Sequence, residues 1–254
     1  MKQFDLSGRV AVVTGGNGGI GFGMAKALAE AGAAILVVGR NAAKNERAVA
    51  ALTALGGHAD AHQADVTDEA ACRGLVGAAT ARFGRLDILV NNAGMNIRKA
   101  PEAYSMSEWR QILEVNLTSA FACSQAAHPE MKRGGGGKII NIGSMTSIFG
   151  TSFAAPYGAS KGGLVQLTRA LAVAWAADNI QVNAVLPGWI DTDLTRRARQ
   201  DVAGLNERVL ARTPAGRWGD PADFGGVAVF LASPASGFVT GTAIPVDGGY
   251  SVHS

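Results

Sequence analysis

The stretch Thr14-Gly15-Gly16-Asn17-Gly18-Gly19-Ile20-Gly21 lies between two segments that give it a meaning. Before it, the apolar run from Arg9 to Thr14 is typical of a strand buried on both faces. After it, apolar residues recur at helical spacing as far as Gly32, and Ala34 to Val38 forms a second apolar run. In a strand, glycine turn, helix and strand of this kind, the turn lets a pyrophosphate approach the N–H groups at the helix start. We therefore predict a nucleotide-binding site.

The alternation of apolar runs and helical patterns continues to the end of the chain. Further strands are predicted at His58 to Ala64, Leu86 to Val90, Lys138 to Ile142, Ile180 to Leu186 and Thr242 to Val246. Helices are predicted over residues 41–56, 68–83, about 107–131, 157–177 and 221–232, with Pro129 bending or ending the long one. The pattern predicts an α/β fold: one domain over residues 1–254, with a doubly wound, seven-stranded parallel sheet and helices on both faces. Residues 188–219 show no clear period and are predicted to form a mobile lid over the substrate.

Composition narrows the class of protein. Of 254 residues, 48% are hydrophobic and 17% charged, which is typical of a compact soluble chain. A net charge of +3, with basic residues spread along the chain, does not indicate a nucleic-acid partner. No apolar run is long enough for a membrane span, and the N-terminus shows no cleavage signal. Cys72 and Cys123 are too few for a disulfide framework, so we expect a cytoplasmic protein.

The end of the second strand bears on the choice of cofactor. An acidic residue that would hold the ribose 2′-hydroxyl of NAD is expected there, but the sequence reads Val37-Val38-Gly39-Arg40-Asn41. The guanidinium of Arg40 suits a 2′-phosphate, so NADP is favoured and NAD stays possible. The alternative is that Arg40 merely begins the next helix in solvent.

Polar residues follow the carboxyl ends of the later strands, where ligands bind in such sheets. They are Asp65, Asn91, Ser144 and Pro187 with Gly188. No metal site is predicted, because His58 and His62 have no further ligand nearby.

Tyr157 and Lys161 lie one helical turn apart, so their side chains share a face. A free tyrosine has a pKa of about 10, and a fixed neighbouring cation lowers it towards neutrality. An ordinary surface contact is the alternative for this spacing. Asn116 is unusual in an apolar helical face, where it is either functional or a structural amide that bridges two backbone segments.

Taken together, these motifs resemble the short-chain dehydrogenase/reductase family over nearly the whole chain. The resemblance rests on Thr14-Gly15-x-x-x-Gly19-x-Gly21, Asp65, Asn91-Asn92-Ala93-Gly94, Asn116, Ser144, Tyr157-x-x-x-Lys161, and Pro187-Gly188 with Thr192. It implies a Rossmann-fold, NAD(P)-dependent and commonly tetrameric oxidoreductase, here a homotetramer, with the catalytic residues Asn116, Ser144, Tyr157 and Lys161. The cofactor residues it implies are Gly15, Asn17, Gly19, Ile20, Gly21, Arg40, Asp65, Val66, Asn91, Ala93, Tyr157, Lys161, Pro187, Gly188, Ile190 and Thr192.

The resemblance also implies a role for each catalytic residue. Tyr157 would take the hydroxyl proton of an alcohol, or protonate a ketone in the reverse direction. Ser144 would hold the substrate oxygen. Lys161 would lower the pKa of Tyr157 and hold the nicotinamide ribose, and Asn116 would hold a water that links Lys161 to solvent.

Within the family, the chain looks most like sugar-acid dehydrogenases of the gluconate 5-dehydrogenase and 2-deoxygluconate 3-dehydrogenase group. This likeness rests on residues 92–99 and 213–219. Arg98, just beyond the fourth strand, is either a ligand of a substrate carboxylate or a surface or interface arginine. The expected substrate is a secondary alcohol or ketone, such as a sugar, polyol or sugar acid. The alternatives are a 3-oxoacyl-[acyl-carrier-protein] reductase and, more remotely, a dinucleotide-binding regulator without turnover.

Overall fold

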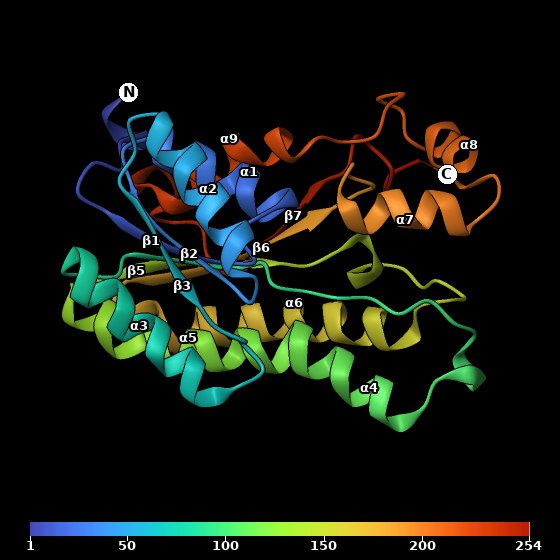
Figure 1. Ribbon diagram of the computed structural model, residues 1–254, viewed down its shortest axis with the longest axis horizontal. Helices are drawn as coiled ribbons and strands as arrows, with labels where there is room; N and C mark the ends of the chain where they lie inside the picture. Colours follow the sequence, from blue (N-terminus) through green and yellow to red (C-terminus); the bar gives the residue numbers. More distant parts are fainter. Residues whose placement is uncertain (254) are drawn as a thin grey trace.

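Seven parallel strands form one sheet, in the order β3-β2-β1-β4-β5-β6-β7 (Figure 1). The computed structural model describes residues 1–253. The strands are β1 (Val10–Thr14), β2 (Ala34–Gly39), β3 (Ala59–Gln63), β4 (Ile88–Asn91), β5 (Gly137–Ile142), β6 (Ile180–Pro187) and β7 (Ala243–Val246). The prediction of a doubly wound Rossmann sheet is confirmed.

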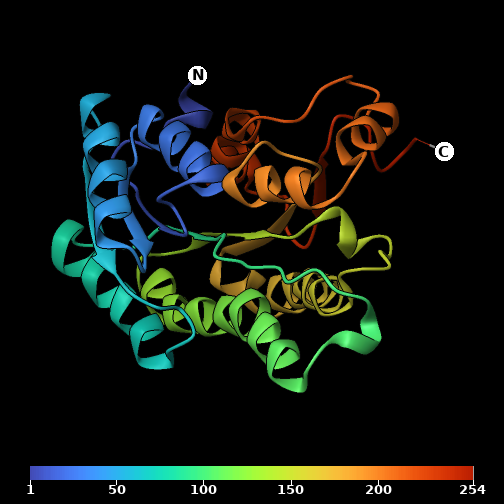
Figure 2. The same ribbon diagram turned by 45° about the vertical axis from the view of Figure 1, so that its right-hand side comes forward.

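Helices cover both faces of this sheet (Figures 1 and 2). One layer holds α1 (Gly19–Glu30), α2 (Ala42–Ala54) and α9 (Gly225–Ala232), and the other holds α3 (Glu69–Phe83), α5 (Ser119–Arg133) and α6 (Ala155–Trp175). The remaining α-helices are α4 (Met106–Leu113), α7 (Asp193–Asp201) and α8 (Leu205–Arg212). In both views, α7 and α8 lie together at one end of the molecule, near the C-terminus.

Strand β1 shows why the sheet lies at the centre of the molecule. All five of its residues are buried, and alternate side chains point to opposite faces. Ala11 and Val13 pack in the cluster of α1 and α9, whereas Val10 and Val12 pack in the cluster of α3 and α5. A strand that is covered on both sides has no polar face, and this accounts for the continuous apolar run in the sequence.

The strand order reverses between β1 and β4, which places two loops side by side. Thr14, the last residue of β1, is in register with Asn91, the last residue of β4. The glycine loop and the Asn91–Gly94 loop therefore leave the sheet at the same point. This reversal is where open α/β sheets bind their ligands.

The helix predicted over residues 107–131 is present, but it is not a regular α-helix throughout. It consists of α4 and α5, joined by a π-helical turn at Glu114–Thr118 that contains Asn116. Pro129 does not end α5, which continues to Arg133. Ala127 and Met131 on either side of it are fully buried, and we attribute the continuation to their packing.

Residues 188–219 are also more regular than the sequence indicated, because they contain α7 and α8. A capping box between Thr192 and Thr195 begins α7. Most of this short helix is charged, so the sequence shows little apolar period. Ala198, Leu205 and Val209 form a small apolar cluster against Trp189 and Trp218.

Candidate active site

A cavity of about 590 Å³ opens at the carboxyl ends of the strands. Most of the predicted site residues line it: Gly15, Asn17, Gly19, Ile20, Arg40, Asp65, Val66, Ala93, Ser144, Tyr157, Lys161, Pro187, Gly188, Ile190 and Thr192. Gly21, Asn91, Asn116 and Arg98 do not. The structure thus brings together residues from seven separate segments of the chain.

The glycine loop follows the end of β1 closely because its residues lack side chains. Gly15 and Gly19 have positive φ values of 63° and 51°, a region that other residues rarely adopt. A Cβ atom on Gly21 would overlap the amide of Asn92 and the carbonyl of Gly15. Gly21 therefore acts by packing α1 against the neighbouring loop. Within residues 1–253, no side chain caps the N-terminus of α1, so its first N–H groups are open to water or a ligand.

A pair of amides fixes the glycine loop to the end of β2. Asn17 donates from Nδ2 to Oδ1 of Asn45 at 2.6 Å, and Asn45 donates to the carbonyl oxygen of Gly39 at 2.8 Å. A Cβ atom on Gly39 would overlap Asn17. Residue 39 has no carboxylate, and the side-chain amide of Asn17 occupies the space that such a side chain would need. The sequence reasoning missed Asn45, which carries no motif of its own.

Two ion pairs lie at the same end of the cavity. The guanidinium of Arg40 lies 3.7 Å from the carboxylate of Asp65, although 75% of the Arg40 side chain is exposed to solvent. The pKa of Asp65 is below its usual value, chiefly because the backbone N–H of Thr67 donates to the carboxylate, with a smaller contribution from the Arg40 charge. The second pair joins Lys44 and Asp193, both of which line the cavity and neither of which was predicted.

Asn91 differs from its predicted place. Its side chain is buried beneath the cavity, where Nδ2 donates to Asn141 Oδ1 at 2.8 Å and to Ser124 Oγ at 3.0 Å. Asn92 lines the cavity instead and donates to the carbonyl oxygens of Thr14 and Gly15. In a strand end, alternate residues face opposite ways, so a shift of one residue exchanges these roles.

Ser144, Tyr157 and Lys161 form the other end of the cavity. Ser144 follows β5, and the other two lie on the first turns of α6, with Lys161 Nζ 5.7 Å from the ring centroid of Tyr157. Lys161 is 4% exposed and donates from Nζ to the carbonyl oxygen of Ile142 at 2.7 Å. This burial lowers the pKa of Lys161 to about 8.

Burial has the opposite effect on the tyrosine. It raises the pKa of Tyr157 from its usual value, against smaller lowering contributions from the Ser144 hydroxyl and the positive charge of Arg98. That Lys161 lowers the pKa of Tyr157 stays a prediction. The Lys161 Nζ lies over the Tyr157 ring, 5.7 Å from its centroid, and donates to the Ile142 carbonyl oxygen.

Asn116 is fully buried behind the cavity, where it bridges two segments. Its Nδ2 donates to the Met95 carbonyl oxygen at 2.9 Å and to Ser160 Oγ at 3.1 Å, while its Oδ1 accepts the Met95 N–H at 2.8 Å. A Cβ atom on Gly94 would lie 3.4 Å from Asn116 Oδ1 and 3.6 Å from Lys161 Nζ. The amide thus has the bridging contacts of a structural residue and also faces the same glycine as Lys161.

Arg98 lies beside this end of the cavity, close enough for its charge to act on Tyr157. Its neighbour Lys99 is paired with Glu108 at 2.5 Å, whereas within residues 1–253 Arg98 makes no ion pair. The same part of the chain holds no group of three or more His, Cys, Asp and Glu side chains placed to bind a metal. Nor does it contain a helix long and apolar enough to cross a membrane.

Comparison with known proteins gives matches over almost the full length. A family model described as enoyl-(acyl carrier protein) reductase matches residues 15–251. The 2-dehydro-3-deoxy-D-gluconate 5-dehydrogenase of Dickeya dadantii is 44% identical over 251 residues, which cover 98% of each chain. The rhamnolipid-biosynthesis 3-oxoacyl-[acyl-carrier-protein] reductase of Pseudomonas aeruginosa is 39% identical over 252 residues, covering 97% of this chain and 98% of that protein.

A solved structure is similar throughout. It is a gluconate 5-dehydrogenase from Burkholderia cenocepacia in complex with NADP and tartrate, with a TM-score of 0.94 and 41% identity. The match covers 100% of this chain and 99% of that one.

Proposed function

The chain belongs to the short-chain dehydrogenase/reductase family and is a dehydrogenase acting on CH–OH groups, and from this premise we propose that its substrate is a sugar acid and its cofactor NADP(H). The reaction is hydride transfer between the nicotinamide and a secondary alcohol or ketone. The observation that carries the proposal is the convergence of Ser144, Tyr157 and buried Lys161 at one end of a cavity whose other end is a glycine loop.

The residues around the glycine loop fit a dinucleotide. The uncapped N–H groups at the start of α1 favour a pyrophosphate, and the glycines allow it to come close. Arg40 is the residue for a 2′-phosphate, since Gly39 and Asn17 leave no carboxylate to hold a ribose hydroxyl. The nicotinamide, when bound, supplies or accepts the hydride.

Tyr157 and Ser144 handle the substrate oxygen. In oxidation, the Tyr157 phenolate takes the hydroxyl proton, and in reduction the phenol returns it to the oxygen of the ketone. Ser144 donates a hydrogen bond to that oxygen as its charge changes.

Lys161 and Asn116 carry the proton between Tyr157 and solvent in this proposal. With a pKa of about 8, Lys161 is able to gain or lose a proton near neutral pH. Asn116 Oδ1 accepts only one hydrogen bond from the protein, from Met95, so it has a lone pair left for a water molecule. We assign to Asn116 the holding of a water between Lys161 and solvent.

Arg98 is the residue that we assign to a substrate carboxylate. Its charge acts at Tyr157, and its own chain gives it no carboxylate partner within residues 1–253. The Burkholderia protein holds tartrate, a hydroxy acid with two carboxylates, together with NADP. We further propose that residues 1–254 form one domain, in which residues 188–219, with α7 and α8, form the substrate lid.

A panel of aldonates, 2-keto-3-deoxy sugar acids, neutral polyols and ketones, with NADP(H) and NAD(H), tests this proposal by nicotinamide absorbance. We expect turnover of sugar acids with NADP(H) and little or none of neutral polyols. Turnover of acetoacetyl thioesters alone would favour the 3-oxoacyl reductase activity of the Pseudomonas relative. Nucleotide binding without turnover of any compound would favour a regulatory protein.

We also propose a homotetramer, on the family likeness alone. Sedimentation velocity or light scattering on the purified chain tests it, and a monomer would contradict it. Cys72 and Cys123 are both buried and unpaired, which suits the reducing conditions of the cytoplasm, where we place the reaction.

A further inference from the structure

Lys44 occupies a position that local helix energetics disfavour. It is the third residue of α2, whose N-terminus is capped by Asn41 and whose first turn contains no acidic residue. The N-terminus of a helix carries a partial positive charge, so a lysine there is less stable than a neutral or acidic residue. Its side chain nonetheless lines the cavity, as Arg40 and Asn41 do. A locally unfavourable residue at the rim of a site indicates a function.

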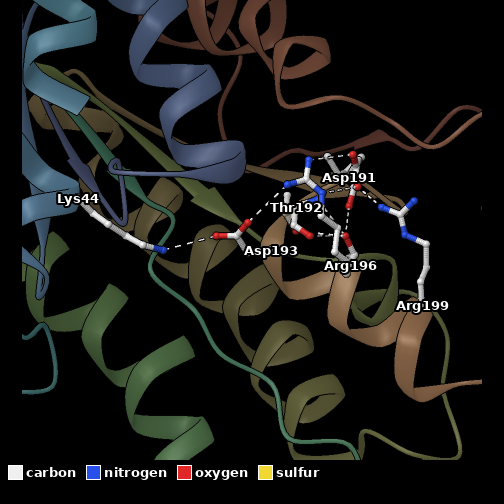
Figure 3. A network of polar contacts seen from close by, with 8 residues as sticks. Lys44, Asp191, Thr192, Asp193, Arg196 and Arg199 are labelled. Carbon is white, nitrogen blue, oxygen red and sulfur yellow. Dashed lines mark hydrogen bonds and ion pairs between the residues drawn. The ribbon is translucent and has the colours of Figure 1, made fainter. Parts of the chain in front are cut away.

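The partner of Lys44 comes from a distant part of the chain. Its Nζ lies 3.5 Å from the carboxylate of Asp193, the first residue of α7 (Figure 3). Asp193 also lies 3.6 Å from Arg196, whose guanidinium donates two hydrogen bonds to Asp191. Asp193 therefore keeps a cationic neighbour when Lys44 moves away.

We propose that Lys44 and Asp193 form a latch across the rim of the cavity, which the 2′-phosphate of the nucleotide opens by taking Lys44 as its second cation beside Arg40. This inference rests on the nucleotide-binding half of the proposed function. It adds two determinants of cofactor specificity: Lys44 attracts the 2′-phosphate, and Asp193 competes with the phosphate for Lys44.

Both ion pairs, Lys44–Asp193 and Arg40–Asp65, are exposed, and this favours the exchange of a carboxylate for the 2′-phosphate. Half of the Lys44 side chain and 78% of the Asp193 side chain are exposed, and exposed ion pairs contribute little stability. A phosphate carries nearly two negative charges and three acceptor oxygens, so it attracts a lysine more strongly than one carboxylate does. Arg40 is likewise only loosely held, at 3.7 Å from Asp65.

The latch also links the phosphate to the lid. Asp193 begins α7, and Thr192 and Thr195 of the same turn line the cavity. A nucleotide without a 2′-phosphate leaves Lys44 bound to Asp193 and α2 joined to α7. A nucleotide with the phosphate releases this contact, so the two cofactors give different restraints on the first turn of α7.

Calorimetric titration of the full-length protein with 2′,5′-ADP and with 5′-AMP tests the latch. Lys44→Met should weaken binding of 2′,5′-ADP about tenfold and that of 5′-AMP less than about twofold. Asp193→Asn should strengthen binding of 2′,5′-ADP by about two- to threefold, because the phosphate no longer competes for Lys44. Equal effects on the two ligands would overturn the proposal.

Two further variants separate the latch from simpler explanations. Asp191→Asn is the control: it removes the partner of Arg196 and leaves Lys44 and Asp193 in place. It should therefore change the affinities for 2′,5′-ADP and 5′-AMP by the same factor. The gain from Asp193→Asn should disappear in the Lys44→Met background. An equal gain in both backgrounds would mean plain repulsion by Asp193 and would overturn the latch. Neither probe contains nicotinamide, so the result stands apart from any failure to find a substrate.

Discussion

The two ends of the cavity are built in opposite ways. At the nucleotide end, Arg40 and Lys44 are exposed and loosely paired with Asp65 and Asp193. At the catalytic end, Lys161 is almost wholly buried and is held by a single carbonyl oxygen.

This difference indicates what each end is suited to do. Exposed pairs exchange partners at little cost, which suits charges that bind and release a phosphate. A buried group without a counter-charge keeps a displaced pKa, which suits a group that moves protons. Substitutions at the catalytic end should therefore change turnover, and those at the nucleotide end should change the affinity for the cofactor.

The largest effect is expected at the phenol. Tyr157→Phe removes the proton donor and acceptor while keeping the ring, so kcat should fall roughly 10³-fold. The dissociation constant for NADPH, measured by fluorescence titration, should stay within about twofold. Substantial residual turnover would remove Tyr157 from the reaction, and a large loss of NADPH affinity would mean that the two ends are not separate.

The buried lysine should be visible in the pH dependence of stability. Its pKa is about 8 in the folded protein and near 10.5 when unfolded, so between these values the unfolded chain binds more protons and stability rises with pH. From pH 8 to 10, this contributes about 2 kcal/mol to the free energy of unfolding. Denaturant titrations should show that Lys161→Met loses this rise.

Lys138 gives a matched control for that measurement. Burial also lowers its pKa to about 8, but it lies outside the cavity and donates to Ser236. Lys138→Met should remove a similar part of the rise and leave turnover intact. If the free energy of unfolding of Lys161→Met rose with pH as steeply as that of the wild type, the lowered pKa of Lys161 would be contradicted.

A smaller effect is expected at Arg40, because it is exposed. Arg40→Ala should weaken NADPH binding about tenfold and NADH binding by less than about twofold. Arg47→Ala removes the same charge from α2 outside the cavity and is the control. If both cofactors lose affinity equally, Arg40 does not bind the 2′-phosphate.

The smallest effect is expected at the substrate. Arg98→Ala should raise the KM for an acidic substrate about fivefold, and that for a neutral polyol hardly at all, since a partly exposed ion pair contributes modestly. Lys99→Ala, which removes an adjacent charge already paired with Glu108, should change neither. A uniform rise in both KM values for Arg98→Ala would assign Arg98 to general packing.

The sequence predicted best what the main chain determines. The glycine loop and the buried strands follow from the absence of side chains or from continuous burial, and both leave a clear pattern. The sequence was a poorer guide to contacts that a side chain makes with a distant segment of the chain. The exchange of Asn91 for Asn92 in the cavity is one case, because the direction of a residue at a strand end depends on the exact register.

Lys44 and Asn45 are a second case. Their partners Asp193 and Asn17 are distant in sequence, so no local motif marks either pair. The π-helical turn at Asn116 is a third. It carries the hydrogen bonds of Asn116 to Met95 and Ser160, and the local helical pattern contains no sign of these contacts.

That turn has a consequence for how the chain tolerates insertions and deletions. A π-helical turn accommodates one residue more than a regular helix, so α4 and α5 differ in rotational phase by roughly 100°. Loss of any single residue from 114–118 would let one continuous helix form. The deletion cancels the extra residue, so Cys123, Ala127 and Met131 would still face the sheet, whereas the amide of Asn116 would lose the turn that directs it towards Met95. A one-residue deletion there should spare the core and damage the proton path, whereas one within the regular part of α5 should damage the core.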